Sequence, residues 1–288
     1  MKKYITLLCI VFTITACDKV EGPYITDADS YVNPDKKIII EDFTGHKCSN
    51  CPDAAREIET IHEIYGDQII SMGIHVSNSF ARPNPIGNSY DYDFRTNWGD
   101  DWYEEYGISS IGLPKGMVNR IGVLDESHIL GKDEWASIVA SELQKEVSFL
   151  ISIEADTNTI IVSSKLEKNL SNNFNLVVCL TENHIINWQT DGSESNSNYE
   201  HNHVLRSVIY DNKLSNQNGF ETGEIIENSF DINLTELEQY NIDYSTNEAV
   251  GGNGNAGGWN TSNISVVAYI YNTNTKEIVQ VEEAHLNN

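Results

Sequence analysis

The chain has little positive charge. Its 288 residues include 18 lysines and arginines against 43 aspartates and glutamates, which gives a formal net charge of −25. Because lysines and arginines are too few to form a surface that neutralises phosphate, nucleic acid is not an expected partner. A solvated surface that keeps the protein soluble explains the acidity itself.

The N-terminus lacks a hydrophobic run long enough to cross a bilayer. Lys2 and Lys3 precede a short apolar stretch, residues 4–14, and Ile14-Thr15-Ala16-Cys17 follows. This segment resembles a bacterial lipoprotein signal peptide. The alternative is an ordinary signal peptide with a chance cysteine.

The resemblance implies removal of residues 1–16, lipidation of Cys17, and membrane attachment through the N-terminal lipid. Residues 17–36 contain few aliphatic side chains and no periodicity, so we expect a tether. Asp18 next to the lipidated cysteine favours inner-membrane retention in some bacteria.

Cysteines are also few. After lipidation of Cys17, the mature chain would keep Cys48, Cys51 and Cys179. An odd number, with two spaced C-x-x-C, argues against a scaffold held by disulfides. The chain must therefore rely on hydrophobic cores, and its length allows two domains. Cys179 lies in an apolar run and is predicted to be a buried, inert thiol.

Residues 38–52, IIIEDFTGHKCSNCP, combine an apolar run, a turn and the C-x-x-C pair. The apolar run predicts a buried strand over residues 37–43. Apolar residues at helical spacing follow from Ala54 to Tyr65, and residues 68–76 read as the next strand. A β-α-β order of this kind is typical of parallel strands.

The position of the two cysteines favours dithiol chemistry. Cys48 precedes a helix N-terminus, where N–H groups lower a thiol pKa, and His46 and Lys47 are nearby cations. Cys51, one turn on, can attack a mixed disulfide. We therefore predict Cys48 as an exposed nucleophile and Cys51 as the resolving thiol.

Two other interpretations of the C-x-x-C pair remain open. It is either an inert structural disulfide or half of a zinc site. The second half of a zinc site is not evident. His201 and His203 are predicted on one face of an exposed polar strand or loop in the other domain. We expect no metal and no cofactor.

Residues 132–146 predict an amphipathic helix at the end of the first half. After residue 146 the pattern changes, and roughly seven alternating runs separated by turns follow. They predict an antiparallel β-sandwich without clear helices. Arg206 is expected to pair with an acid. The aromatic residues within 90–106 are expected to form a helix core or to line a groove over the dithiol.

Three features of the first half resemble the thioredoxin superfamily: the strand–turn–C-x-x-C–helix order, Asp42 before Cys48, and Leu113-Pro114 before a later strand. The resemblance implies that Asp42 accepts a proton during catalysis, with a solvated carboxylate as the alternative. It also implies a cis bond at Pro114, and a substrate groove shaped by Leu113 and His46.

The sequence departs from thioredoxin at Ser49-Asn50 between the cysteines, at Lys47 and at Leu113. The implied fold is an α/β thioredoxin-like domain over residues 37–147, followed by an all-β, immunoglobulin-like sandwich over 148–288.

The mature chain also resembles a narrower family, the Omp28-related outer-membrane lipoproteins. Four phrases carry the resemblance: FTGHKCSNCP at 43–52, GLP at 112–114, YEHNHVLR at 199–206 and VVAYIYN at 266–272. This resemblance implies an envelope protein, anchored by lipid and placed in the outer membrane, more than it implies an activity.

We therefore expect thiol–disulfide exchange with protein thiols or disulfides of the envelope, with catalytic Cys48, Cys51, Asp42 and Pro114. The alternative is a non-enzymatic surface-binding or adhesin-like lipoprotein in which Cys48–Cys51 is a structural disulfide.

Overall fold

The structure is a computed structural model that describes residues 32–215 and 220–287. The predicted signal peptide, Cys17 and most of the predicted tether lie outside the described residues. Tyr31–Asn288 forms one compact unit. No helix in its described part is long and apolar enough to cross a membrane.

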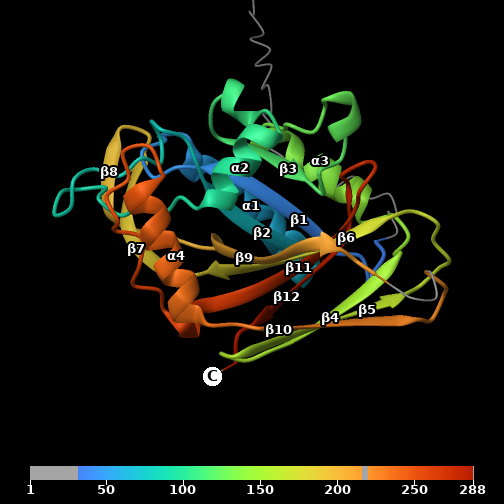
Figure 1. Cartoon of the computed structure of the whole chain (residues 1–288). Helices are drawn as coiled ribbons and strands as arrows, with labels where there is room; N and C mark the ends of the chain where they lie inside the picture. Colours follow the sequence, from blue (N-terminus) through green and yellow to red (C-terminus); the bar gives the residue numbers. More distant parts are fainter. Residues whose placement is uncertain (1–31, 216–219, 288) are drawn as a thin grey trace, which may run out of the picture. The chain divides into compact units, whose positions relative to one another are not determined.

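The described residues form a strand-rich mixture of helices and strands (Figure 1). In chain order the elements are β1 Ile38–Thr44, α1 Cys51–Tyr65, β2 Ile69–His75, α2 Asn97–Glu105, β3 Lys115–Val118, α3 Lys132–Glu142, β4 Phe149–Ala155, β5 Thr159–Leu166, β6 Phe174–Glu182, β7 Ile185–Asp191, β8 Glu194–His201, β9 Val204–Lys213, β10 Ile225–Asp231, α4 Leu234–Asn247, β11 Ile264–Asn272 and β12 Ile278–His285.

The predicted β-α-β opening is confirmed, and β1 and β2 pair in parallel. Successive side chains of a strand point to opposite faces. Ile38 and Ile40 therefore share a core with α1 and α3, whereas Ile39 and Phe43 pack with α2 on the other face. The first face becomes polar toward the end of β1, at Asp42 and Thr44.

One sheet joins the two halves of the chain, in the order β12-β11-β6-β9-β2-β1-β3. The connection between the halves is short: Gly73 in β2 pairs with Val204 in β9, and its N–H donates to the carbonyl of His203 at 2.8 Å. The boundary predicted at 147/148 falls between α3 and β4, and strands from both sides share the sheet. A mixed α/β fold is therefore shown, and a thioredoxin-like and immunoglobulin-like split is not confirmed.

The sandwich expected in the second half is present in part. A three-stranded sheet, β10-β5-β4, shares a core with β6 and β11, where Phe149, Ile160, Phe174 and Val266 are buried. The expectation of no clear helix is wrong, because residues 234–247 form helix α4. Residues 185–201 form a separate hairpin, β7–β8, for which no strand was predicted.

A buried network around Arg120 links the two halves. Arg120, 2% exposed, donates from Nε to Glu41 Oε2 at 2.8 Å and from Nη2 to Glu41 Oε1 at 2.5 Å. It also donates to the hydroxyls of Tyr106 and, across the sheet, Tyr269 in β11. A desolvated charge needs such partners, so this network fixes β1 against β11.

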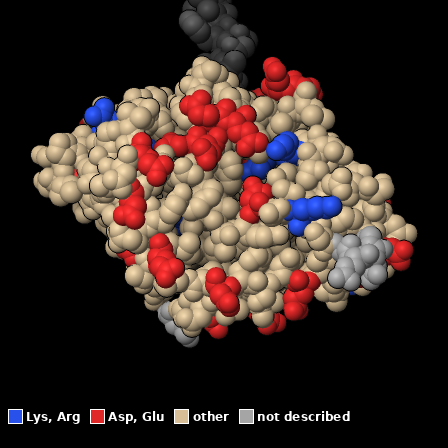
Figure 2. Space-filling view, in the orientation of Figure 1, with Lys and Arg blue, Asp and Glu red and all other residues tan. Residues whose placement is uncertain are grey.

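The surface reflects the composition. On the face shown in Figure 2, acidic side chains are widely spread and gather over α2, whereas Lys and Arg are sparse. Asp101, Glu104 and Glu105 of α2 are exposed. The last tether residues are not free: Lys36 is buried, and its Nζ donates to the carbonyl of Val279.

Candidate functional site

The C-x-x-C pair lies in the turn between β1 and α1. Gly45 is required there, because a Cβ would lie 2.6 Å from the carbonyl oxygen of Phe80. Cys48 and Cys51 form a disulfide, and Cys51 begins α1, followed by Pro52 in its first turn. Each cysteine is 2% exposed. The predicted solvent-exposed Cys48 is therefore wrong.

The β7–β8 hairpin is hydrogen-bonded to the loop that contains the buried cysteines. The N–H of Thr190 donates to the carbonyl of His46 at 2.8 Å, and the N–H of Gly192 donates to the carbonyl of Ser49 at 2.9 Å. The side chain of Gln189 donates to the carbonyl of Cys48 at 3.1 Å. The hairpin thus covers the loop that the sequence predicted to be open.

His46 does not act as the predicted cation beside the thiol. Its ring is fully buried, and it contacts the rings of Tyr90 and Phe94. Burial lowers the pKa of His46 to about 3, so the imidazole is neutral at pH 7. Lys47 donates to the carbonyl of Arg82 and to Asn84 Oδ1.

Leu113-Pro114 lies at the same end of the sheet as the disulfide. Lys115, the next residue, pairs with Phe43 near the end of β1. The Leu113–Pro114 bond is cis, as the sequence resemblance implied. Both residues are half-buried. Their role in a substrate groove stays a prediction.

Asp42 is not a solvated carboxylate. It is 5% exposed, and its Oδ1 has no hydrogen-bond partner among the described residues. Burial raises the pKa of Asp42 to about 7. A carboxyl with this pKa exchanges a proton near neutral pH, which is compatible with proton transfer and also with binding a polar ligand.

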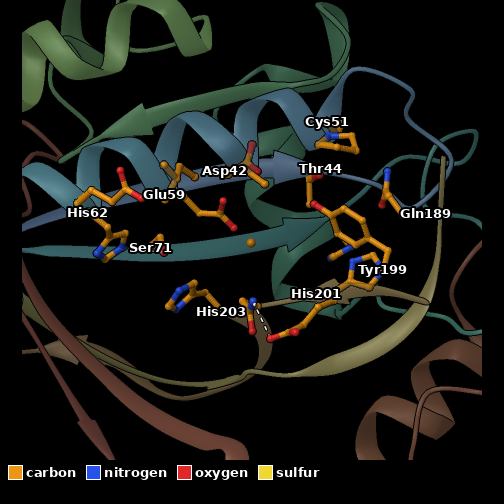
Figure 3. Close-up of a pocket in the computed structure, with 18 residues that line it drawn as sticks. Asp42, Thr44, Cys51, Glu59, His62, Ser71, Gln189, Tyr199, His201 and His203 are labelled. Carbon is orange, nitrogen blue, oxygen red and sulfur yellow. Dashed lines mark hydrogen bonds between the residues drawn. The ribbon is translucent and has the colours of Figure 1, made fainter. Parts of the chain in front are cut away.

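A cavity of about 500 Å³ opens beside the disulfide. Its floor is the polar end of β1 and β2, with Asp42, Thr44, Ser71, Gly73 and His75 on one face of the sheet. Helix α1 forms one wall, and β8 with the turn after it forms the other. Figure 3 shows the side chains of these elements around the cavity.

The walls carry different chemistry. From α1 come Cys51, Pro52, Ala55, Ile58, Glu59, His62 and Glu63. From β7, β8 and the following turn come Gln189, Tyr199, Glu200, His201, Asn202 and His203. Cys48 is absent from this lining. The disulfide therefore meets the cavity through Cys51.

The cavity contains four imidazoles, arranged as two pairs. The rings of His62 and His203 stack with centroids 5.8 Å apart, and those of His75 and His201 lie 5.5 Å apart. His201 is 5% exposed and ends β8, whereas His203 lies beyond it with a φ of 55°. The predicted shared strand face and solvent exposure are thus wrong, although the two residues line one cavity.

Burial keeps these imidazoles neutral at pH 7. It lowers the pKa of His201 and of His203 to about 4, and that of His75 well below 6.5. Both ring nitrogens of His75 lack a partner among the described residues. Within residues 32–215 and 220–287, no group of three or more His, Cys, Asp or Glu side chains is placed to hold a metal ion.

Three predictions away from the cavity are confirmed. Cys179 is a buried free thiol. Arg206 is paired with Glu182, Nε to Oε2 at 2.7 Å. Trp102 and Tyr106 are buried in a hydrophobic core.

Two solved structures have a similar fold. The chain matches HBP35 of Porphyromonas gingivalis with a TM-score of 0.57 and 12% identity, over 88% of this chain and 76% of that one. It matches protein AGR_C_4864 from Agrobacterium tumefaciens with a TM-score of 0.52 and 12% identity, over 88% and 95%. These likenesses concern the fold alone. A search of curated proteins finds no match.

The fold and site thus define a mixed α/β protein with a covered disulfide and a histidine-lined cavity. The family model described as outer membrane protein Omp28 matches residues 100–249. The chain belongs to the Omp28 family.

Proposed function

We propose that this chain is a non-enzymatic binding lipoprotein of the cell envelope, in which Cys48–Cys51 is a structural disulfide. The family supports the envelope location, because its model describes an outer membrane protein. The proposal includes lipid attachment at Cys17, which would anchor the protein to the membrane.

The burial of the disulfide carries this proposal. Nucleophilic attack needs access to sulfur, and both cysteines are 2% exposed beneath the β7–β8 hairpin. The cavity beside them has the size of a small-molecule site and the buried polar groups that such sites contain. The disulfide and the hairpin hold the wall of that cavity in place.

Thiol–disulfide exchange with envelope proteins is the second candidate, and one observation favours it. Asp42, with its raised pKa, and Cys51 both line the cavity. A substrate thiolate in the cavity would attack Cys51 Sγ, forming a mixed disulfide and releasing the Cys48 thiolate. If Cys48 then attacks Cys51 Sγ, the original disulfide forms again and the substrate leaves unchanged. If a second substrate thiol instead attacks the substrate sulfur, Cys51 leaves as a thiolate, the substrate gains a disulfide and Cys48 and Cys51 are reduced.

Single-cysteine variants separate the two candidates. In Cys51→Ala and Cys48→Ala, one thiol remains to form a stable mixed disulfide with a substrate. We expect neither variant to retain an envelope protein in non-reducing gels beyond the level of the Cys48→Ala/Cys51→Ala double variant. A discrete partner released by reductant would overturn the structural role and establish exchange.

A further inference from the structure

The cavity beside Cys51 is rich in hydrogen-bond acceptors, and neither lysine nor arginine lines it. Among its lining residues, the ionisable groups are four carboxyl groups, four imidazoles and one phenol, with no lysine or arginine. Two arginines that act electrostatically on lining residues are already paired, Arg56 with Asp53 and Asp191, and Arg206 with Glu182. The cavity lining therefore offers carboxyl groups and no permanently charged cation.

Two buried groups of the cavity floor have unused hydrogen-bonding capacity. Asp42 Oδ1 and both ring nitrogens of His75 lack a partner, although the side chains are 5% and 4% exposed. An unpaired buried polar atom costs free energy, which a ligand hydrogen bond would recover. These groups are thus a second observation, independent of the acidic rim, that points to a ligand.

A third acceptor follows from the tautomer of His201. Its Nε2 lies 3.3 Å from the carbonyl oxygen of Trp188, which can only accept a hydrogen bond. Nε2 therefore carries the proton, and Nδ1 of the neutral ring presents a lone pair. Figure 3 shows His201 across the cavity from Asp42.

The rim of the cavity is acidic, and its wall is partly apolar. Glu59 and Glu63 are exposed on α1, and neither makes an ion pair within the described part of the chain. Pro52, Ala55 and Ile58 supply apolar wall between the rim and the floor. Tyr199 faces them as a neutral phenol, whose ring face attracts cations.

We propose that this cavity binds a small organic cation with primary amine groups and an apolar stem, such as a linear diamine or polyamine. One ammonium would donate to Asp42 and His201, the alkyl chain would cover Ile58, and the other ammonium would lie near Glu59. This ligand class rests on the proposed binding function and specifies it.

Titration calorimetry of the full-length protein with putrescine, 1,4-butanediol and succinate tests the proposal. The three probes share a four-carbon chain and differ in charge. We expect saturable binding of putrescine alone, weakened by added salt. Equal binding of putrescine and butanediol, or no binding of putrescine, would overturn the cation class.

Matched variants locate the site. Glu59→Gln should weaken the binding of putrescine about threefold, because it removes one exposed charge. Asp42→Asn should weaken it about tenfold, because it replaces a carboxylate acceptor. Glu57→Gln makes the same charge change on α1 outside the cavity and should leave affinity unchanged. Equal effects of Glu59→Gln and Glu57→Gln would place binding elsewhere and contradict the proposal.

The two proposals fail separately. A partner trapped on Cys48 or Cys51 would overturn the structural role of the disulfide, and it would not change the conclusion drawn from putrescine binding. Saturable binding of succinate or butanediol in place of putrescine would overturn the cation class and leave the binding function in place.

Discussion

The side-chain amide of Gln189 in β7 donates to the backbone carbonyl of Cys48 at 3.1 Å, across 141 residues of sequence. The same nitrogen lies 3.3 Å from the carbonyl oxygen of Gly45. This one buried side chain therefore closes the C-x-x-C loop and holds the hairpin that forms the far wall of the cavity.

Replacing Gln189 tests this role. Gln189→Ala should lower the free energy of unfolding by about 1–3 kcal/mol, because buried carbonyls lose their donor. Gln239→Ala, an exposed glutamine in α4, is the matched control and should change stability by less than about 0.5 kcal/mol. Urea denaturation measures both, and an equal effect of the two variants would contradict the role.

Asp42 should make stability depend on pH. Its folded pKa, about 7, lies above the value of 3.8 for an unperturbed carboxyl, so the folded state holds the proton more tightly. This contribution is fully present below pH 3.8 and is lost as pH rises to 7, by about 1.4 kcal/mol per unit.

Asp42→Asn replaces the carboxyl group with a neutral amide of similar shape, so the side chain at position 42 no longer titrates. We expect the stability of the variant relative to the wild type to rise from pH 5 to about pH 7 and then to level off. The neighbouring histidines are present in both proteins, so their contribution cancels in this difference. Urea denaturation at several pH values gives this difference. A difference that does not change with pH would show that Asp42 has an ordinary pKa.

The Arg120–Glu41 pair should be a major determinant of stability. Arg120→Met leaves Glu41 buried and unpaired, so we expect a loss of about 3–5 kcal/mol. Arg56→Met removes an exposed pair with Asp191 and should cost at most about 1 kcal/mol. Similar losses for the two variants would mean that the buried Arg120 network contributes no more to stability than an exposed ion pair.

The sequence predicts local elements well where apolar periodicity is strong. Ile38–Ile40 gave β1, and the spacing from Ala54 to Ile61 gave α1. The β7–β8 hairpin was missed because residues 194–200 are mostly polar and exposed, so no apolar alternation marks them. The Asp191-Gly192 turn was its available signal. Helix α4 was missed although Asn233 caps it by accepting from the N–H of Glu236.

The candidate site was predicted only in part, because it depends on contacts between distant segments. Cys51 and Asp42 follow from local motifs. His201 and His203 are brought beside them by the pairing of Gly73 with Val204, and no local sequence pattern specifies that pairing. The contacts of the β7–β8 hairpin with the C-x-x-C loop also join distant segments, which explains why Cys48 was predicted to be exposed.

The rate at which dithiothreitol reduces Cys48–Cys51, followed by thiol labelling at increasing urea concentrations, tests the structural role of the disulfide most directly. A covered disulfide reacts only when the hairpin or the whole fold opens. We predict slow reduction in buffer and a rate that rises with urea in parallel with unfolding. Rapid reduction in buffer, independent of urea, would contradict this account and favour a reactive dithiol.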